Sequence, residues 1–226
     1  MRGGLTGLIA AAAFVAAAAP ASAQRRFVGD VPRAGSWELS GGATWSGGFD
    51  GPEQPAELTR NGDREGGFDL FQSDSRVGGA PGAGAALAYY VSRAVAIEGG
   101  IRFSRPRLTV DLSGDFENAE PISADEVLTR YVMTGSFVLH LRQSGQAVPF
   151  VAVGAGYVRD LHEGQELVET GTEYHVLGGI KYWFGRARRR FGLRGEAGMS
   201  ITDGGFDFKD EPRVLPIASA RLIYLF

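Results

Sequence analysis

The sequence has no cysteine, and after its N-terminal segment it has no second apolar run of the roughly 20 residues that a membrane-spanning helix needs. The missing cysteines exclude a small secreted scaffold held together by disulfide bonds. The missing apolar run means that any integral membrane form of the chain has to be a closed β-barrel. The formal net charge of −3 gives no sign of a basic surface for nucleic acid.

Zinc-binding spacings, phosphate-binding loops and nucleophile elbows are also missing, so we predict no cofactor and no metal. The segment 203–207, Asp-Gly-Gly-Phe-Asp, lacks the ordered ligand spacing of a calcium-binding loop. Among the three histidines, we consider only His162, with the acidic residues Asp160 and Glu163, as a candidate catalytic cluster. A solvated loop histidine is the simpler interpretation of His162.

Residues 1–23 have the pattern of a secretory signal peptide. Arg2 supplies a short basic start, an alanine-rich apolar stretch follows, and Ala21-Ser22-Ala23 forms a small-x-small cleavage site. An uncleaved N-terminal anchor is the alternative, although the apolar stretch is short for a membrane span. We predict that the chain is exported and cleaved after Ala23, which leaves a single mature domain over residues 24–226.

The last residues, 213–226, alternate between two faces with the period of a β-strand. One face is wholly apolar and ends in the aromatic pair Tyr224 and Phe226, whereas the other carries Ser219 and Arg221. An apolar face that ends in aromatic residues is typical of a strand that leaves a bilayer. A buried final strand of a soluble β domain is the alternative.

Seven earlier segments show the same alternation, which makes eight predicted strands. They cover residues 37–45, 83–91, 95–104, 130–141, 151–157, 174–184 and 191–201. The long connections are predicted as polar loops over residues 47–76, from after residue 112 to about 125, 159–172 and 202–211, and the short ones as turns at 92–93, 143–146 and 185–189. Long extracellular loops that alternate with short periplasmic turns are typical of transmembrane barrels.

One connection departs from a simple loop. After Pro106 the apolar parity changes, because Leu108, Val110 and Leu112 fall on the phase opposite to the apolar face of the preceding strand. This change predicts a bulge or a protruding hairpin arm at that point.

The outward aromatic residues, the segment Val153-Gly154-Ala155-Gly156-Tyr157 and the ending Tyr224-Leu225-Phe226 resemble the small eight-stranded outer-membrane barrels, the group of the OmpA transmembrane domain, OmpX and the opacity-like proteins. The resemblance implies an all-β, antiparallel, up-and-down barrel in the Gram-negative outer membrane, surrounded by lipid and lipopolysaccharide. It also implies that Tyr224 and Phe226 are an assembly signal for the barrel-assembly machinery, and that the extracellular loops contact any surface ligand.

The lumen of an eight-stranded barrel is narrow enough for its own side chains to fill. Because a charge left unpaired there would destabilise the barrel by several kcal/mol, we expect the inward charges to pair, with Glu38 and Glu196 bound to Arg221 or Arg194. An ion-conducting pathway is the alternative. The predicted network consists of Glu38, Glu98, Arg102, Arg130, Lys181, Arg194, Glu196 and Arg221.

Three classes of function fit this sequence. A lipid-modifying enzyme of the outer leaflet is one, but no histidine here is part of the His-x-Ser pair found in eight-stranded lipid A deacylases. A soluble lipocalin-like barrel is disfavoured because the charged residues lie opposite the apolar face. We favour a non-enzymatic, porin-like barrel with a plugged lumen and a role in envelope integrity or surface contact; a lipid-modifying enzyme or a small-solute channel is the alternative.

Overall fold

The computed structural model describes residues 32–51, 54–58, 68–115, 119–162, 167–185, 190–204 and 212–226. The predicted signal peptide, with Ala21 and Ala23, lies outside these ranges, as do most of the segments 202–211 and 185–189. Within the described ranges, no helix is long and apolar enough to cross a membrane.

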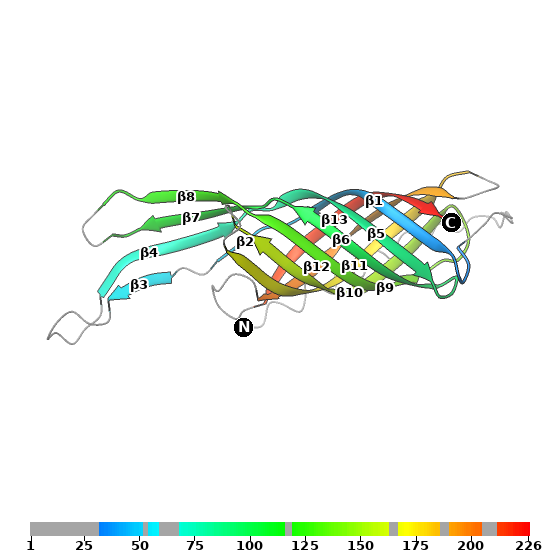
Figure 1. The fold of residues 1–226 in the computed structure, drawn as a ribbon, viewed down its shortest axis with the longest axis horizontal. Coiled ribbons are helices and arrows are strands. Elements are labelled where there is room, and N and C mark those ends of the chain that lie inside the picture. The colour runs from blue at the N-terminus through cyan, green and yellow to red at the C-terminus, as the bar shows by residue number, and fades with distance from the viewer. Residues whose placement is uncertain are drawn as a thin grey trace.

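Eight antiparallel strands close into a barrel in the order β1-β13-β12-β11-β10-β9-β6-β5 (Figure 1). The first and last strands close it, with Ala43 opposite Ala220. The prediction of an eight-stranded, up-and-down barrel is therefore confirmed. The strands are β1 (Trp37–Ser46), β5 (Ala80–Tyr90), β6 (Val95–Ser104), β9 (Thr129–His140), β10 (Ala147–Leu161), β11 (Val168–Trp183), β12 (Phe191–Gly204) and β13 (Arg213–Leu225).

The outward face of the barrel is apolar and the inward face carries the charges. Phe137 and Leu222 are 63% and 66% exposed, whereas Arg194 is only 1% exposed. A lipocalin-like barrel would hide its apolar side chains inside, so the soluble alternative is excluded. Aromatic pairs lie near both ends of the wall, Trp37–Tyr89 with ring centroids 4.9 Å apart and Phe103–Tyr131 at 5.3 Å, as expected of the two interfacial girdles of a membrane barrel.

A second sheet extends from one end of the barrel, at the left of Figure 1. Its strands are β2 (Phe49–Asp50), β3 (Gln54–Leu58), β4 (Phe68–Val77), β7 (Arg107–Ser113) and β8 (Ile122–Val127). They pair in the order β2-β4-β7-β8, with β3 also paired to β4, and we call them the protruding sheet. The prediction that residues 47–76 form a polar loop was therefore wrong, and the loop predicted after residue 112 ends before 125, because β8 begins at Ile122.

The protruding sheet continues one side of the barrel wall. In β6 and β9, Ser104 faces Arg130, and further out Leu108 faces Glu126 in an unchanged register. The predicted hairpin arm after Pro106 is confirmed, and it forms without a bulge on this side.

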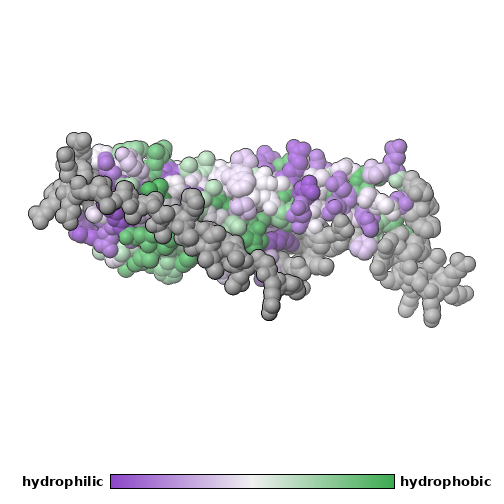
Figure 2. Space-filling model, turned by 180° about the vertical axis from the view of Figure 1, so that it is seen from behind, coloured by the Kyte–Doolittle hydropathy of each residue, from purple (hydrophilic) through white to green (hydrophobic). Residues whose placement is uncertain are grey.

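Beyond the barrel, the apolar side chains change to the other face of the strands. Leu108 keeps the inward parity of Ser104, and it is buried together with Val77 and Leu128 in a small core. The loop prediction was wrong because strands were identified by an outward apolar face. In the protruding sheet the outward face is polar, so its strands were not recognised. Figure 2 shows hydrophobic residues gathered over the barrel and hydrophilic residues over the protruding sheet.

Exposed ion pairs cover the outer face of the protruding sheet. Arg76 Nε donates to Asp50 at 2.5 Å, and this hydrogen bond raises the pKa of Arg76. The Thr109 hydroxyl donates to Asp125 at 2.6 Å and, together with Arg107, holds the pKa of Asp125 below its usual value. Because solvent screens exposed ion pairs, each pair adds little to the stability of the fold. Together the pairs make this face of the protruding sheet polar.

Strands β10 and β11 are longer than predicted. Their pairing extends to Leu161 opposite Val168, inside the segment 159–172 that was predicted as a loop, so these bounds were wrong. As a consequence, Asp160 takes an inward position on a strand, and it is only 2% exposed.

Candidate functional site: the barrel lumen

The end of the lumen that lies opposite the protruding sheet, predicted to be the periplasmic end, is closed by an aromatic plug. We give this name to Tyr90, His140, Phe150 and Trp183, which are all buried. Tyr90 and His140 stack with ring centroids 5.2 Å apart, and Phe150 lies against His140 at 6.3 Å. The inward parity of β5, β9, β10 and β11 brings these four large rings to one level, where they fill the cross-section.

A buried lysine–glutamate pair lies on the aromatic plug. Lys181 Nζ donates to both carboxylate oxygens of Glu38 at 2.8 Å, and the Tyr90 hydroxyl donates to the same carboxylate at 2.5 Å. Lys181 is 0% exposed and Glu38 is 1% exposed. The charges are therefore fully desolvated, which is tolerated because each has its counter-charge and further hydrogen bonds.

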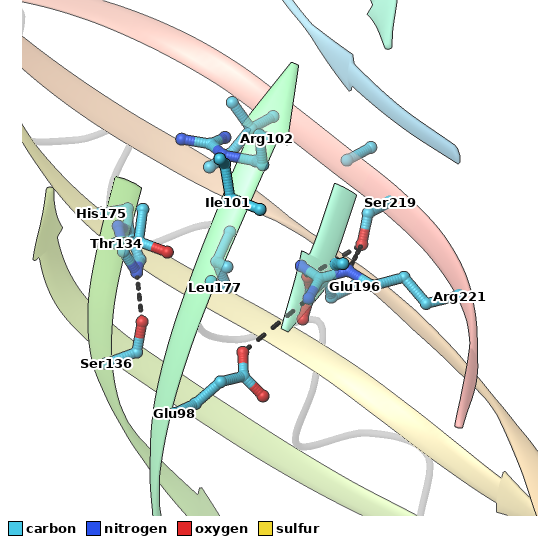
Figure 3. Close-up of a pocket in the computed structure, with 14 residues that line it drawn as sticks. Glu98, Ile101, Arg102, Thr134, Ser136, His175, Leu177, Glu196, Ser219 and Arg221 are labelled. Atoms are coloured by element: carbon cyan, nitrogen blue, oxygen red, sulfur yellow. Dashed lines mark hydrogen bonds and ion pairs between the residues drawn. The ribbon is translucent and has the colours of Figure 1, made fainter. Parts of the chain in front are cut away.

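The next layer joins two arginines to two glutamates. Arg194 pairs with Glu98 and Glu196, and Arg221 pairs with Glu196 and lies 3.8 Å from Glu98. The Ser219 hydroxyl donates to Glu196 at 2.8 Å. Figure 3 shows Glu98, Glu196 and Arg221 converging from different strands. Closed pairing of this kind leaves little free charge for a passing ion.

Two further ion pairs lie toward the protruding sheet. Arg102 pairs with Glu173, and Arg130 donates to both oxygens of Asp160 at 2.7 and 2.8 Å. The fork of the guanidinium matches the carboxylate in this two-point contact, which fixes Asp160 more firmly than a single bond would.

The ion pairs described above join five cations of the lumen to five carboxylates. They are Arg102, Arg130, Lys181, Arg194 and Arg221 against Glu38, Glu98, Asp160, Glu173 and Glu196. Glu196 binds both arginines named for it in the sequence analysis, whereas the direct partner of Glu38 is Lys181 and its nearest arginine atom, on Arg194, is 4.0 Å away.

Sequence reasoning missed Asp160 and Glu173. Asp160 was assigned to a loop, and Glu173 lay next to the predicted end of the same loop. The signal that could have found them is parity: each lies an even number of residues from inward positions on its own strand, Gly154 and His175 respectively.

No protein-family model matches the sequence, and no curated protein matches it. Among solved structures, the outer membrane protein OprG from Pseudomonas aeruginosa matches with a TM-score of 0.54 at 10% sequence identity, covering 86% of this chain and 97% of that chain. The chain shares the barrel fold of that outer membrane protein. Its resemblance to the small eight-stranded outer-membrane barrels is thereby confirmed at the level of the fold.

Two other matches are weaker in geometry. Ail, the attachment invasion locus protein of Yersinia pestis, has a TM-score of 0.42 at 12% identity, covering 85% of this chain and 99% of that chain. AlkL, an outer membrane protein solved in lipid bilayers, has a TM-score of 0.40 at 15% identity, covering 92% and 95%.

Two small cavities interrupt the packing of the barrel's lumen. Each offers about 30 Å³ to the centres of water molecules. Arg102 lines both cavities and so separates them. The cavity lined by Ser136 and His175 is called the lower cavity. The cavity lined by Arg130 and Ser200 is called the upper cavity. Because a water needs roughly 10–15 Å³ on this measure, each has room for two or three waters.

His162 lies at the mouth of the barrel and is not the solvated loop histidine that the sequence suggested. Its Nδ1 lies 3.0 Å from Glu126, its Nε2 lies 3.6 Å from Glu169, and its side chain is only 12% exposed. Asp160, its predicted neighbour, is bound to Arg130 instead, and Glu163 lies outside the described residues. Within the described ranges, no group of three His, Cys, Asp or Glu side chains is placed to hold a metal ion.

Proposed function

We propose that this barrel is a non-enzymatic outer-membrane protein with a closed lumen, which supports the envelope and contacts other molecules through its protruding sheet. The observation that carries the proposal is the balanced set of ion pairs above an aromatic plug. Desolvated charges that are already paired bind ions poorly, and the ring of Phe150 at 0% exposure closes the path below them.

The proposed closure of the lumen is tested by planar-bilayer recording on the refolded barrel. We expect no steady conductance from the wild type. We also expect Arg221→Ala to lower the unfolding temperature without opening a pore, since Glu196 would lose one partner while Arg194 remains bound to it. A large, stable open state in either protein would favour the alternative of a small-solute channel.

The positions of the histidines argue against an enzyme that acts on lipid. His140 and His175 are both buried on the lumen side, and His162 lies at the mouth between two glutamates. None of the three is placed on the lipid-facing wall, where a base would have to meet an acyl chain of the outer leaflet. Unchanged lipid A, in mass spectra from a strain that lacks the protein, is the expected result.

Location in a bilayer is part of the proposal, and the three tryptophans allow a test. Trp37 and Trp45 are 41% and 45% exposed on the outer wall, whereas Trp183 is 1% exposed inside. In vesicles that contain brominated lipid, single-tryptophan variants should be quenched strongly at positions 37 and 45 and weakly at 183. Equal quenching at all three positions would contradict the proposed orientation.

The proposed partners follow from the same placement. Arg105 and Arg159 are both exposed: Arg159 lies opposite Tyr131, and Arg105 lies two residues beyond Phe103, at the level where we place the phosphates of lipopolysaccharide. Binding of lipopolysaccharide by wild type and Arg159→Ala would test this contact. The assembly role of Phe226 stays a prediction, which assembly assays on Phe226→Ala would test. Any surface ligand is expected on the protruding sheet.

A further inference from the structure

Three side chains that the proposed role does not use lie side by side in the lumen. Ser136 Oγ is hydrogen-bonded to His175 Nε2 at 2.9 Å, and His175 Nδ1, which makes no hydrogen bond, lies 3.4 Å from Glu173 Oε1. All three are buried, and Ser136 and His175 line the lower cavity (Figure 3). Nucleophile, base and orienting carboxylate in this order activate the serine of hydrolases, and the spacing is often loose before a substrate binds.

Gly154 makes this arrangement possible. It lies on β10, between β9 and β11, with Ser136 opposite on one side and His175 opposite on the other. A Cβ at this position would lie 2.7 Å from both His175 Nε2 and Ser136 Oγ. The serine and the histidine therefore meet across an intervening strand, because the residue between them has no side chain.

The surroundings supply the remaining groups of an acyl-transfer site. Arg102 binds Glu173 and so fixes the carboxylate that faces His175. Backbone amides in these strands are used in the ladder, so no pair of them is free to stabilise a negative oxygen. Arg102 and Arg221 line the same cavity; each is already paired with a glutamate, so a negative oxygen there would share their N–H groups with Glu173 and Glu196.

We propose that Ser136 is an activated nucleophile, with His175 as its base and Glu173 as the orienting carboxylate, and that it is acylated by small water-soluble esters. Ser136 Oγ bonds to the carbonyl carbon while its proton passes to His175 Nε2. The ester C–O bond then breaks, and the leaving oxygen takes that proton.

The geometry also sets the class of substrate. Ser136 faces the lumen and is 7% exposed, so acyl chains in the surrounding bilayer do not reach it. The space beside it suits an acyl group about the size of acetyl, since it holds only two or three waters. The aromatic plug closes the periplasmic end, so the substrate enters from the side of the protruding sheet.

The test is acetylation of the refolded wild-type barrel by p-nitrophenyl acetate, with the modified residue located by peptide mass spectrometry. We expect acetyl-Ser136. His175→Gln should lower the rate of acetylation by about 100-fold or more, because it removes the base. Gly154→Ala should also lower it, by displacing the serine from the histidine.

Ser200 is the matched control, since it is a lumen serine at 1% exposure whose hydroxyl has no hydrogen-bond partner. It should remain unlabelled. Heat-modifiable gel mobility shows that each variant is folded. The proposal is wrong if the folded wild type carries no acetyl group on Ser136, if Ser200 is labelled as fast, or if folded His175→Gln reacts at the wild-type rate.

Discussion

Arg194→Ala is expected to lower the free energy of unfolding of the barrel by about 3–5 kcal/mol. Arg194 is 1% exposed and pairs with both Glu98 and Glu196. Removing the guanidinium leaves two carboxylates desolvated and short of counter-charge. Urea titration of the protein in lipid vesicles, followed by tryptophan fluorescence, measures the loss.

Arg93→Ala is the matched control for that variant. Arg93 is exposed in the turn between β5 and β6, and its replacement should change the free energy of unfolding by less than about 0.5 kcal/mol. Adding Glu98→Gln to Arg194→Ala should recover part of the lost free energy of unfolding, because it removes one of the two carboxylate charges that had paired with Arg194. Equal stability of Arg194→Ala and Arg93→Ala would contradict the importance of the ion-pair layer.

Phe150→Ala is expected to destabilise the barrel by about 3–5 kcal/mol, since it empties the centre of the aromatic plug. The ring is 0% exposed, and the Arg194 guanidinium lies over it at 4.6 Å. Gly179 on the neighbouring strand is packed so closely that a Cβ there would lie 2.5 Å from this ring. The site has little freedom to collapse into the space left behind, and the same vesicle titration reports the loss.

Phe137 provides the comparison for Phe150. It belongs to the adjacent strand β9 but points outward, with 63% of its surface exposed. Phe137→Ala removes the same atoms from a fluid lipid contact, and so should destabilise the barrel much less. A loss in Phe150→Ala no larger than that in Phe137→Ala would contradict the description of the plug as tightly packed.

Strand number and sidedness could be predicted because both depend on local alternation. In β6, for example, the alternation of Ile97 and Glu98 in the sequence is enough to assign them to opposite faces of the strand. The protruding sheet could not be predicted in the same way, because the water outside the bilayer reverses which face is apolar. Val77 and Leu108 then point inward. Their strands lack an outward apolar face, so their sequences resemble polar loops.

The content of the lumen was predictable residue by residue, but its pairing was not. Inward parity identifies Glu38 and Lys181 as lumen residues, yet they are 143 positions apart and meet only through the closed order of the strands. The bond between Ser136 and His175 was hidden for a similar reason. Ser136 lies 39 positions before His175 and two strands away in the barrel, so the residues next to the histidine in the sequence do not reveal the pair.

In the proposed bilayer location, the exchange of faces at Pro106 and Leu128 sets the depth at which the barrel sits. A displacement toward the periplasm would carry Asp125 and Thr109 into hydrocarbon, where charged groups on the lipid side are strongly unfavourable. A displacement the other way would lift Phe103 and Tyr131 out of the interface into water. In that location, the protruding sheet holds the barrel at one depth. The ion pairs of the lumen are thereby held at a fixed height relative to the two leaflets.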